Sequence, residues 1–202
     1  MKLTGFLFAA ALLGACTQAA EENYTRHVDP KIGTGGHGHV FVGANVPFGL
    51  VQVGPTSIPQ TWDWCSGYHA SDSTVIGFSH THLSGTGIGD LFDITVMPVV
   101  GEVTYARGEE NDPASGLWSY ADRTREITKP GYYSVPLVRY GIRAELTATA
   151  RVGLHRYTFP ASDAAAVVFD LENGGCWDKA TDTGFRFSDD STRIAGWRCS
   201  TG

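Results

Sequence analysis

Side chains that could carry chemistry are concentrated in one part of the sequence, between residues 27 and 93. Six of the seven histidines lie there: His27, His37, His39, His69, His80 and His82. The same window is rich in glycine, which permits positive φ and lets a ligand approach the backbone closely. Tight turns explain part of this glycine content. A loop-rich window of this composition, held on a rigid scaffold, is where we expect a binding site.

The aromatic segment at residues 61–69 indicates carbohydrate binding. It reads TWDWCSGYH and contains Trp62 and Trp64 together with a tyrosine and a histidine. An aromatic ring can cover the apolar C–H face of a sugar, while carboxylates, hydroxyls and backbone groups bind its polar edge. In an extended segment the two indoles would share one face. The alternative is that one of them is a core residue, and the sequence leaves open which one.

Two His-x-His pairs could bind a metal ion. His37 with His39, and His80 with His82, are each two residues apart, so in a strand both rings of a pair would point the same way. A metal site needs three or four ligands, which two such pairs could supply. We favour hydrogen-bonded structural histidines instead. A His-ligated metalloprotein is the minor alternative, and neither an HExxH motif nor an aspartate-rich calcium loop supports it.

The elements expected to position these groups are strands. Residues 140–149 alternate apolar and polar side chains, which is the period of a half-buried strand. Further strands are predicted at residues 93–105, 154–159, 165–171, 185–187 and 193–198. Pro98 is expected at a sheet edge or a bulge because proline lacks an N–H, and a turn is expected at residues 129–131. Short strands with glycine-rich turns predict a mostly β fold, an antiparallel β-sandwich.

The composition agrees with a single domain and excludes some partners. The chain has 202 residues, of which 42% are hydrophobic and 18% are charged, with 25 glycines. This length suits one β-sandwich with a real core. The net charge of −6 and the absence of any Lys or Arg run argue against a nucleic-acid partner.

The N-terminus reads as a bacterial lipoprotein signal. Lys2 supplies a positive n-region, residues 3–13 are apolar but too short to span a bilayer, and the sequence LGAC ends at Cys16. This resembles a lipobox, in which the cysteine is diacylated and becomes the new N-terminus. We therefore expect a signal-peptide helix within residues 1–15, a polar tether at 16–26 and the folded domain at 27–202. The domain would be exported and lipid-anchored in the cell envelope, at the periplasm or the cell surface.

Three further cysteines, Cys65, Cys176 and Cys199, lie in the exported part. Their number is odd, so at most one disulfide can form among them and one thiol is left over. No Cys-x-x-Cys spacing of the metal-binding type occurs.

Five segments, in order along the chain, resemble glycoside hydrolase family 92. They are VDPKIGTGGHGH at residues 28–39, NVPFGLV at 45–51, WDWCSGY at 62–68, GFSHTHLSGTGIGD at 77–90 and ELTATARVGLHRY at 145–157. Each segment alone is moderately specific, and together they are highly specific. The departures are small: Val42, Ile88 and Phe92 stand where the family commonly has Pro, Cys and a small residue. These departures affect the fine shape of the pocket and not membership.

The resemblance implies a two-domain, calcium-dependent exo-α-mannosidase that inverts anomeric configuration and acts on N-glycans or mannans. Its N-terminal domain would be a sandwich of the galactose-mutarotase type, followed by an (α/α)₆ catalytic domain, with the active site between them. Residues 193–200 read as a strand with only two residues after it, so we expect a chain that stops before the catalytic domain. The catalytic acid and base would lie beyond Gly202, which removes Asp90 and Asp93 as candidates.

This domain would supply one wall of the sugar pocket, and motif matching selects the residues Trp62, Trp64, Cys65, Ser66, Gly67, His80 and His82. The resemblance implies a calcium cofactor held mostly by the catalytic domain, a mannose-containing glycan as ligand, and contact with the membrane only through the lipid. A stand-alone carbohydrate-binding module is the other alternative.

We predict that Cys16 is lipidated. Cells that express the protein should incorporate labelled palmitate into it, and Cys16→Ser should abolish the label because the acceptor thiol is gone. Equal labelling of the wild type and the variant would contradict the lipobox.

Overall fold

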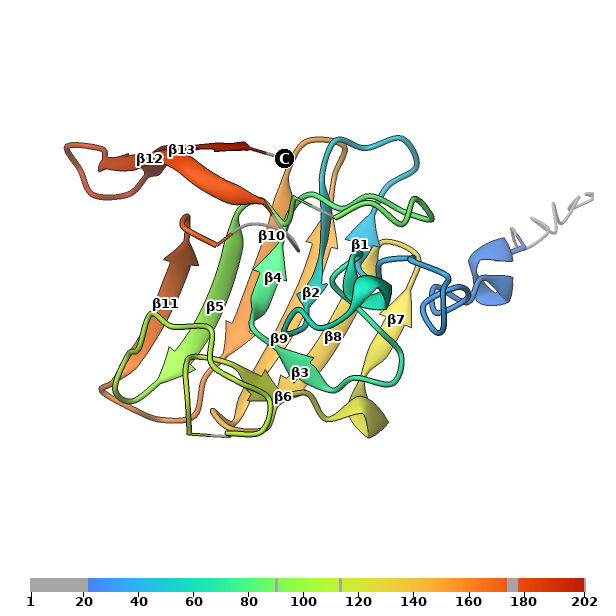
Figure 1. Cartoon of the computed structure of the whole chain (residues 1–202), viewed down its shortest axis with the longest axis horizontal. Helices are drawn as coiled ribbons and strands as arrows, with labels where there is room; N and C mark the ends of the chain where they lie inside the picture. The colour runs from blue at the N-terminus through green and yellow to red at the C-terminus, as the bar shows by residue number, and fades with distance from the viewer. Residues whose placement is uncertain (1–21, 90, 113, 174–177, 202) are drawn as a thin grey trace, which may run out of the picture.

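The computed structural model describes residues 22–89, 91–112, 114–173 and 178–201. The predicted signal peptide, Cys16, Asp90 and Cys176 lie outside these ranges. The described residues form strands and three short 3₁₀ helices, with no α-helix among them. None of the helices in these ranges is long and apolar enough to cross a membrane. The mostly β prediction is therefore confirmed (Figure 1).

The larger of the two main sheets has five antiparallel strands in the order β1-β2-β4-β5-β11. Its strands are β1 (Ala44–Asn45), β2 (Gln52–Thr56), β4 (Gly77–Ser79), β5 (Thr95–Val100) and β11 (Ala165–Asp170). The smaller sheet has four antiparallel strands in the order β10-β9-β8-β7. Its strands are β7 (Ile127–Lys129), β8 (Tyr132–Leu137), β9 (Ile142–Ala148) and β10 (Gly153–Thr158).

The remaining elements are two-stranded pairs and single turns. The pairs are β3 (Thr74–Val75) with β6 (Ser119–Tyr120), and β12 (Lys179–Phe187) with β13 (Ile194–Thr201). The 3₁₀ helices are η1 (Tyr24–His27), η2 (Trp62–Trp64) and η3 (Arg123–Arg125). Figure 1 shows the β12–β13 hairpin extending beside the ends of the main strands. The hairpin strands were predicted, but they are longer than their apolar pattern suggested.

The core lies between the two main sheets. In β9 the side chains of Ile142, Ala144 and Leu146 are buried while those between them are partly exposed, as the alternation predicted. Phe78 of β4 and Tyr133 of β8 are fully buried, and their ring centroids lie 6.5 Å apart across the two layers. Burying each such ring contributes about 2–3 kcal/mol to the free energy of folding, so the burial of these apolar side chains holds the two sheets together.

The expectation for Pro98 was wrong. Pro98 lies inside β5, an internal strand, and is paired with Val167 of β11. The physical reason that a proline is tolerated there is the shortness of β4. β4 pairs with β5 at Phe78 and Val96, so Pro98 lies beyond the stretch where β4 would require an N–H from it.

A buried carboxylate joins separate parts of the sandwich. The side chain of Glu126 is fully buried and accepts hydrogen bonds from Tyr133 at 2.8 Å and from Tyr68 at 3.2 Å. Lys31 Nζ lies 2.6 Å from it, and Arg123 forms a short ion pair with it. Burial would raise the pKa of Glu126, but Arg123 and then Lys31 outweigh it and hold that pKa below its usual value.

We predict that Glu126→Ala destabilises the domain by about 3–5 kcal/mol, because it leaves the buried guanidinium of Arg123 without its counter-ion. Urea unfolding followed by fluorescence would measure the loss. Glu22→Ala is the matched control, since Glu22 forms an exposed ion pair with Arg26, and it should leave the unfolding midpoint unchanged. Equal midpoints for the two variants would contradict the role of Glu126.

Candidate functional site

The aromatic segment forms a 3₁₀ turn, which separates its two tryptophans. Trp62 and Trp64 lie at the two ends of η2, so the segment is not extended and the condition under which they would share one face is not met. The side chain of Trp62 is 53% exposed, and Trp64 is half-buried. Thr61, before the turn, has extended backbone angles. A 3₁₀ helix advances three residues per turn, so residues two apart do not lie one above the other.

The exposed indole of Trp62 is held in one orientation. Its Nε1–H donates to the carbonyl of Gly87 at 2.7 Å. The ring of His39 packs edge-on against it at a centroid distance of 4.2 Å, and His37 lies at 5.8 Å. Gly87 has φ +64°, and a Cβ there would lie 2.8 Å from Cζ2 of the indole. The indole therefore rests directly on the glycine backbone while its other surface stays open.

Asp63 joins the two histidines next to this indole. One of its carboxylate oxygens lies 2.6 Å from Nδ1 of His37 and 3.4 Å from Nε2 of the buried His39. The hydrogen bond from His37 holds the pKa of Asp63 below its usual value, against the opposing effect of desolvation. The site therefore presents a charged carboxylate and an exposed imidazole beside an aromatic surface. These groups can bind the polar edge and the apolar face of a sugar.

Trp64 stabilises the loop at residues 61–69 through contacts with Asp72 and His69. Its Nε1–H donates to Asp72 at 2.6 Å, and its ring stacks on His69 at 4.3 Å. The buried Asp72 also accepts from the backbone N–H of Thr74 at 2.6 Å. Trp64 is thus tied to the start of β3 and contributes to the position of the loop.

Cys65, Ser66 and Gly67 lie beneath the exposed surface. All three are buried. Ser66 Oγ donates to the carbonyl of His39 at 2.5 Å. Gly67 has φ +81°, and a Cβ there would lie 2.9 Å from the ring of Phe92. They hold the turn in place. The other described cysteine, Cys199, is exposed on β13.

His80 and His82 point to different parts of the molecule, contrary to the strand-based expectation. His82 is buried, lies 3.0 Å from Ser79 Oγ and stacks on Phe41 at 5.1 Å. His80 lies 2.9 Å from Nε2 of His155 on β10. The residues after β4 form a loop and not a strand, which is why the pair separates.

The described ranges hold no group of three or more His, Cys, Asp or Glu side chains that could bind a metal. Three of the four paired histidines have hydrogen-bonding partners: His37 has Asp63, His80 has the carbonyl of Ile94, and His82 has Ser79. Asp93, the described member of the carboxylate pair, is bonded to Arg198 at 3.0 Å.

Sequence reasoning missed Gly87 and Asp63 as parts of this site. Gly87 is one of many glycines in this window, and nothing in the neighbouring sequence indicates that it contacts the indole of Trp62. Asp63 stood between the two tryptophans, but its histidine partners are more than twenty residues away in sequence. Only the folded loops bring them together.

Comparison with known proteins decides the family. The model described as the glycosyl hydrolase family 92 N-terminal domain matches residues 27–202. This chain belongs to glycosyl hydrolase family 92. The match begins where the N-terminal helix η1 ends and includes every residue of the Trp62 site.

Solved structures show the same fold as this family 92 domain. A family GH92 alpha-mannosidase from Bacteroides thetaiotaomicron, in complex with mannoimidazole, is 39% identical with a TM-score of 0.84, over 88% of this chain and 23% of the relative. An inverting family GH92 mannosidase from strain VPI-5482 of the same species is 23% identical with a TM-score of 0.63, over 81% of this chain and 20% of the relative. This second likeness shows the fold alone, and the β-sandwich prediction is confirmed.

A protein described as an uncharacterized secreted glycosidase of Arthroderma benhamiae is 28% identical over 168 residues, which is 81% of this chain and 21% of the relative. The family 92 chain therefore spans less than a quarter of the length of each of these relatives.

We predict that Gly87→Ala displaces Trp62, because the added Cβ would overlap the indole. The indole N–H resonance of Trp62 should shift in an NMR spectrum and exchange faster with solvent, since its bond to the Gly87 carbonyl is disturbed. Gly85→Ala is the matched control. Gly85 also has positive φ, +69°, but nothing lies within 4 Å of its Cβ position. It should show the same backbone strain, about 1–2 kcal/mol, with an unshifted Trp62 resonance. A shift of equal size in both variants would refute the contact.

Proposed function

We propose that this chain is the N-terminal part of an exported exo-α-mannosidase that hydrolyses α-mannosidic bonds of N-glycans or mannans with inversion. The observation that carries the proposal is the exposed, orientation-locked indole of Trp62 with Asp63 and His37 beside it. An aromatic surface exposed to water is unfavourable in free energy, and a ligand whose apolar face covers it removes that unfavourable exposure. The family's solved alpha-mannosidase, bound to mannoimidazole, supports a mannose ring as that ligand.

Within this proposal the domain binds and orients, and the acid and base come from the polypeptide beyond residue 202. Inversion requires two carboxyl groups about 6.5–9.5 Å apart, one protonating the glycosidic oxygen and one activating water. The carboxylates of Asp63 and Asp93 are engaged with His37 and Arg198, respectively. An acid must be free to carry a proton and a base free to take one, and these two carboxylates are already bonded to His37 and Arg198.

Calcium belongs to the same proposal. The resemblance to family 92 implies that its ligands lie mostly in the catalytic domain, so we assign them to the rest of the glycosidase and derive no step of this domain from calcium. Trp62 and its neighbours orient the sugar, and the loop under them excludes water from one face of the ring.

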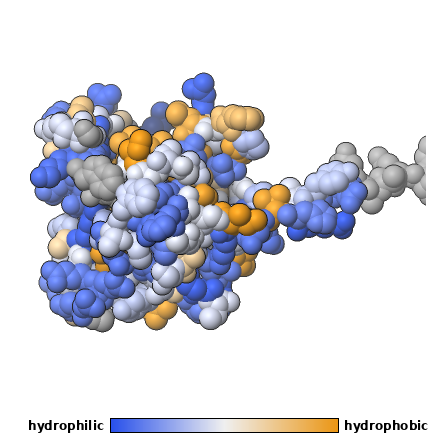
Figure 2. Space-filling view, turned by 45° about the vertical axis from the view of Figure 1, so that its right-hand side comes forward, coloured by the Kyte–Doolittle hydropathy of each residue, from blue (hydrophilic) through white to orange (hydrophobic). Residues whose placement is uncertain are grey.

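Exposed apolar residues support contact with a further domain. Ile32, Phe48, Leu50 and Ile88 are all well exposed, and Figure 2 shows hydrophobic patches among hydrophilic residues on one face. Phe48 also has φ +59°, a costly conformation for a bulky residue. Export with a lipid anchor at Cys16 completes the proposal, and the secreted glycosidase relative supports the export.

We predict that the purified 202-residue chain does not hydrolyse 4-nitrophenyl α-mannoside. In the longer glycosidase that contains it, Trp62→Ala should lower kcat/KM at least about tenfold, or about 1.4 kcal/mol of transition-state binding. Trp64→Ala should act mainly on folding, with a loss below the about 3–5 kcal/mol of a fully buried tryptophan. Steady-state kinetics and thermal unfolding on the same variants separate the two effects.

Turnover by the isolated chain would show that the catalytic groups lie in this domain. Normal kinetics of Trp62→Ala would remove the indole from the sugar site. Tight mannan binding by the isolated chain without turnover would favour the alternative, a stand-alone carbohydrate-binding module.

A further inference from the structure

The two layers of the sandwich are unequal, and part of the larger sheet has no cover. Phe78, Val96 and Phe169 are neighbours across β4, β5 and β11 and share one face. That face looks toward the smaller sheet, because Phe78 packs near Tyr133. Val96 is buried, but Val167 and Phe169 on β11 are 40% and 51% exposed. The inner face of β11 therefore extends beyond the last strand of the smaller sheet.

That last strand, β10, is an open edge of the smaller sheet. Its inward side chains include His155 and Tyr157, and the Tyr157 ring lies 6.0 Å from Phe78. A groove of about 870 Å³ runs between β10, β5 and β11. Phe185, Phe187 and Ile194 of the β12–β13 hairpin form its remaining wall. The groove thus continues the space between the sheets.

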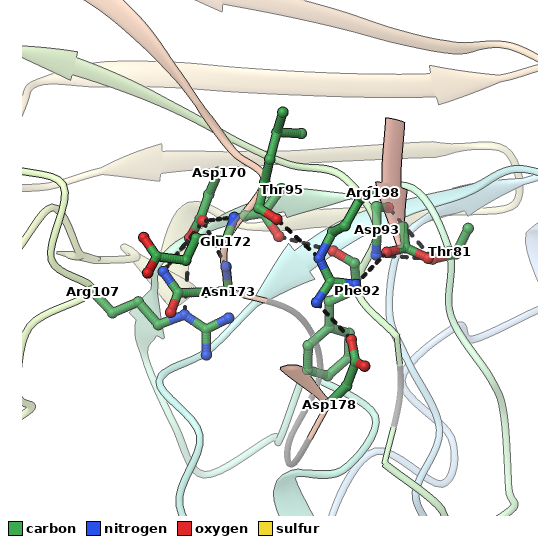
Figure 3. Close-up of polar contacts among 11 residues, drawn as sticks. Thr81, Phe92, Asp93, Thr95, Arg107, Asp170, Glu172, Asn173, Asp178 and Arg198 are labelled. Atoms are coloured by element: carbon green, nitrogen blue, oxygen red, sulfur yellow. Dashed lines mark hydrogen bonds and ion pairs between the residues drawn. The ribbon is translucent and has the colours of Figure 1, made fainter. Parts of the chain in front are cut away.

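The groove is held open by a buried ion cluster (Figure 3). Arg198 of β13 has a side chain only 3% exposed. Its guanidinium lies 3.0 Å from Asp93 and 2.7 Å from Asp178, and its Nε–H donates to the carbonyl of Leu171 at 3.0 Å. These bonds fix the hairpin to the loops at the ends of β5 and β11. The hairpin therefore does not fold down onto Phe169 without breaking a buried charge cluster.

Polar groups in the groove are satisfied among themselves. His80 Nδ1 faces the carbonyl of Ile94 at 2.8 Å and must donate to it, so its Nε2 accepts from His155 at 2.9 Å. His155 Nδ1 then accepts from Tyr157 at 2.7 Å. Burial lowers the pKa of His155 to about 4, which keeps this chain of bonds neutral. What the groove leaves uncovered is apolar surface and a strand edge.

We propose that this groove is a docking surface for β-strands of the same glycosidase polypeptide, C-terminal to residue 202, which extend the smaller sheet from β10 and cover Val167 and Phe169. A strand added to an open edge gains main-chain hydrogen bonds, and its alternate side chains enter the groove. The proposal rests on the proposed function in one respect, that a longer glycosidase contains this chain.

Two observations favour that occupant. The chain spans 23% and 24% of the chain in two solved structures of one relative, so that protein has ample polypeptide to supply strands. The last described strand, β13, is itself a wall of the groove, so residues that follow it start beside the site. A second copy of the chain is the competing occupant.

The first test uses the 202-residue chain alone. Phe169→Lys places a charge on the uncovered face and should lower Tm by less than about 3 °C, because the lysine stays in water. Phe78→Ala, in the covered part of the same face, should lower Tm several times more. A loss for Phe169→Lys as large as that for Phe78→Ala would overturn the proposal, since the face would then already be covered.

The second test supplies the occupant in trans. The chain is co-expressed with the part of the 39%-identical Bacteroides thetaiotaomicron mannosidase that follows its matched region. We expect a one-to-one complex in which the backbone amides of β10 exchange at least 100-fold more slowly than in the chain alone. Phe169→Lys should abolish the complex. Thr158→Lys, on the exposed outer face of β10, should preserve it.

Failure to form the complex, or a complex with unprotected β10 amides, would overturn the proposal. So would a dimer of the chain alone with protected β10, which would identify a second copy as the occupant. Mannoside hydrolysis is assayed separately. A protected complex without turnover would support strand docking while contradicting the proposed function.

Discussion

The buried carboxylate of Glu126 is the interaction on which the arrangement of the loops depends. Its four partners come from separate parts of the chain: Lys31, Tyr68, Arg123 and Tyr133. A fully buried charge is stable only when it is paired and hydrogen-bonded, so all of these segments must converge on it. The network holds the N-terminal loop and the end of the aromatic segment against β8. Arg123 extends it to the backbone of Asp72 at 2.8 Å, and Asp72 in turn holds Trp64.

The sugar site is best understood as a problem of orientation. An exposed indole on a flexible loop would lose entropy on binding a ligand, and each immobilised side chain costs about 0.5–1.5 kcal/mol. In this domain the entropy of the Trp62 side chain is already lost during folding, before a ligand binds. The carbonyl of Gly87 and the ring of His39 hold Trp62 in place before any ligand arrives. Trp64, at the other end of η2, stabilises the loop that carries the site.

The unequal sheets explain a second group of exposed apolar residues that the sugar site does not use. Val167 and Phe169 belong by their register to the interior of the sandwich, yet they face a groove. The Arg198 cluster keeps the β12–β13 hairpin from folding into that groove, because its buried ion pairs with Asp93 and Asp178 would have to break first. The domain therefore has two distinct surfaces that are left uncovered: the exposed aromatic surface of Trp62, which can bind a ligand, and the apolar groove beside the open edge of β10.

Local sequence determined the class of fold and several of its parts. The alternation in β9, the turn before β8 and the absence of helical periodicity are consequences of side-chain spacing, which operates within a few residues. The family was determined by motif order. Contacts between distant residues were decided only by the tertiary structure. The partners of Asp63 are 24 and 26 positions away, those of Arg198 up to 105 and those of His80 up to 75. The sequence named Trp62 and Trp64 as alternatives. A 3₁₀ turn and a glycine carbonyl from another loop decided which indole faces water, because burial is a property of the packed chain and not of the segment.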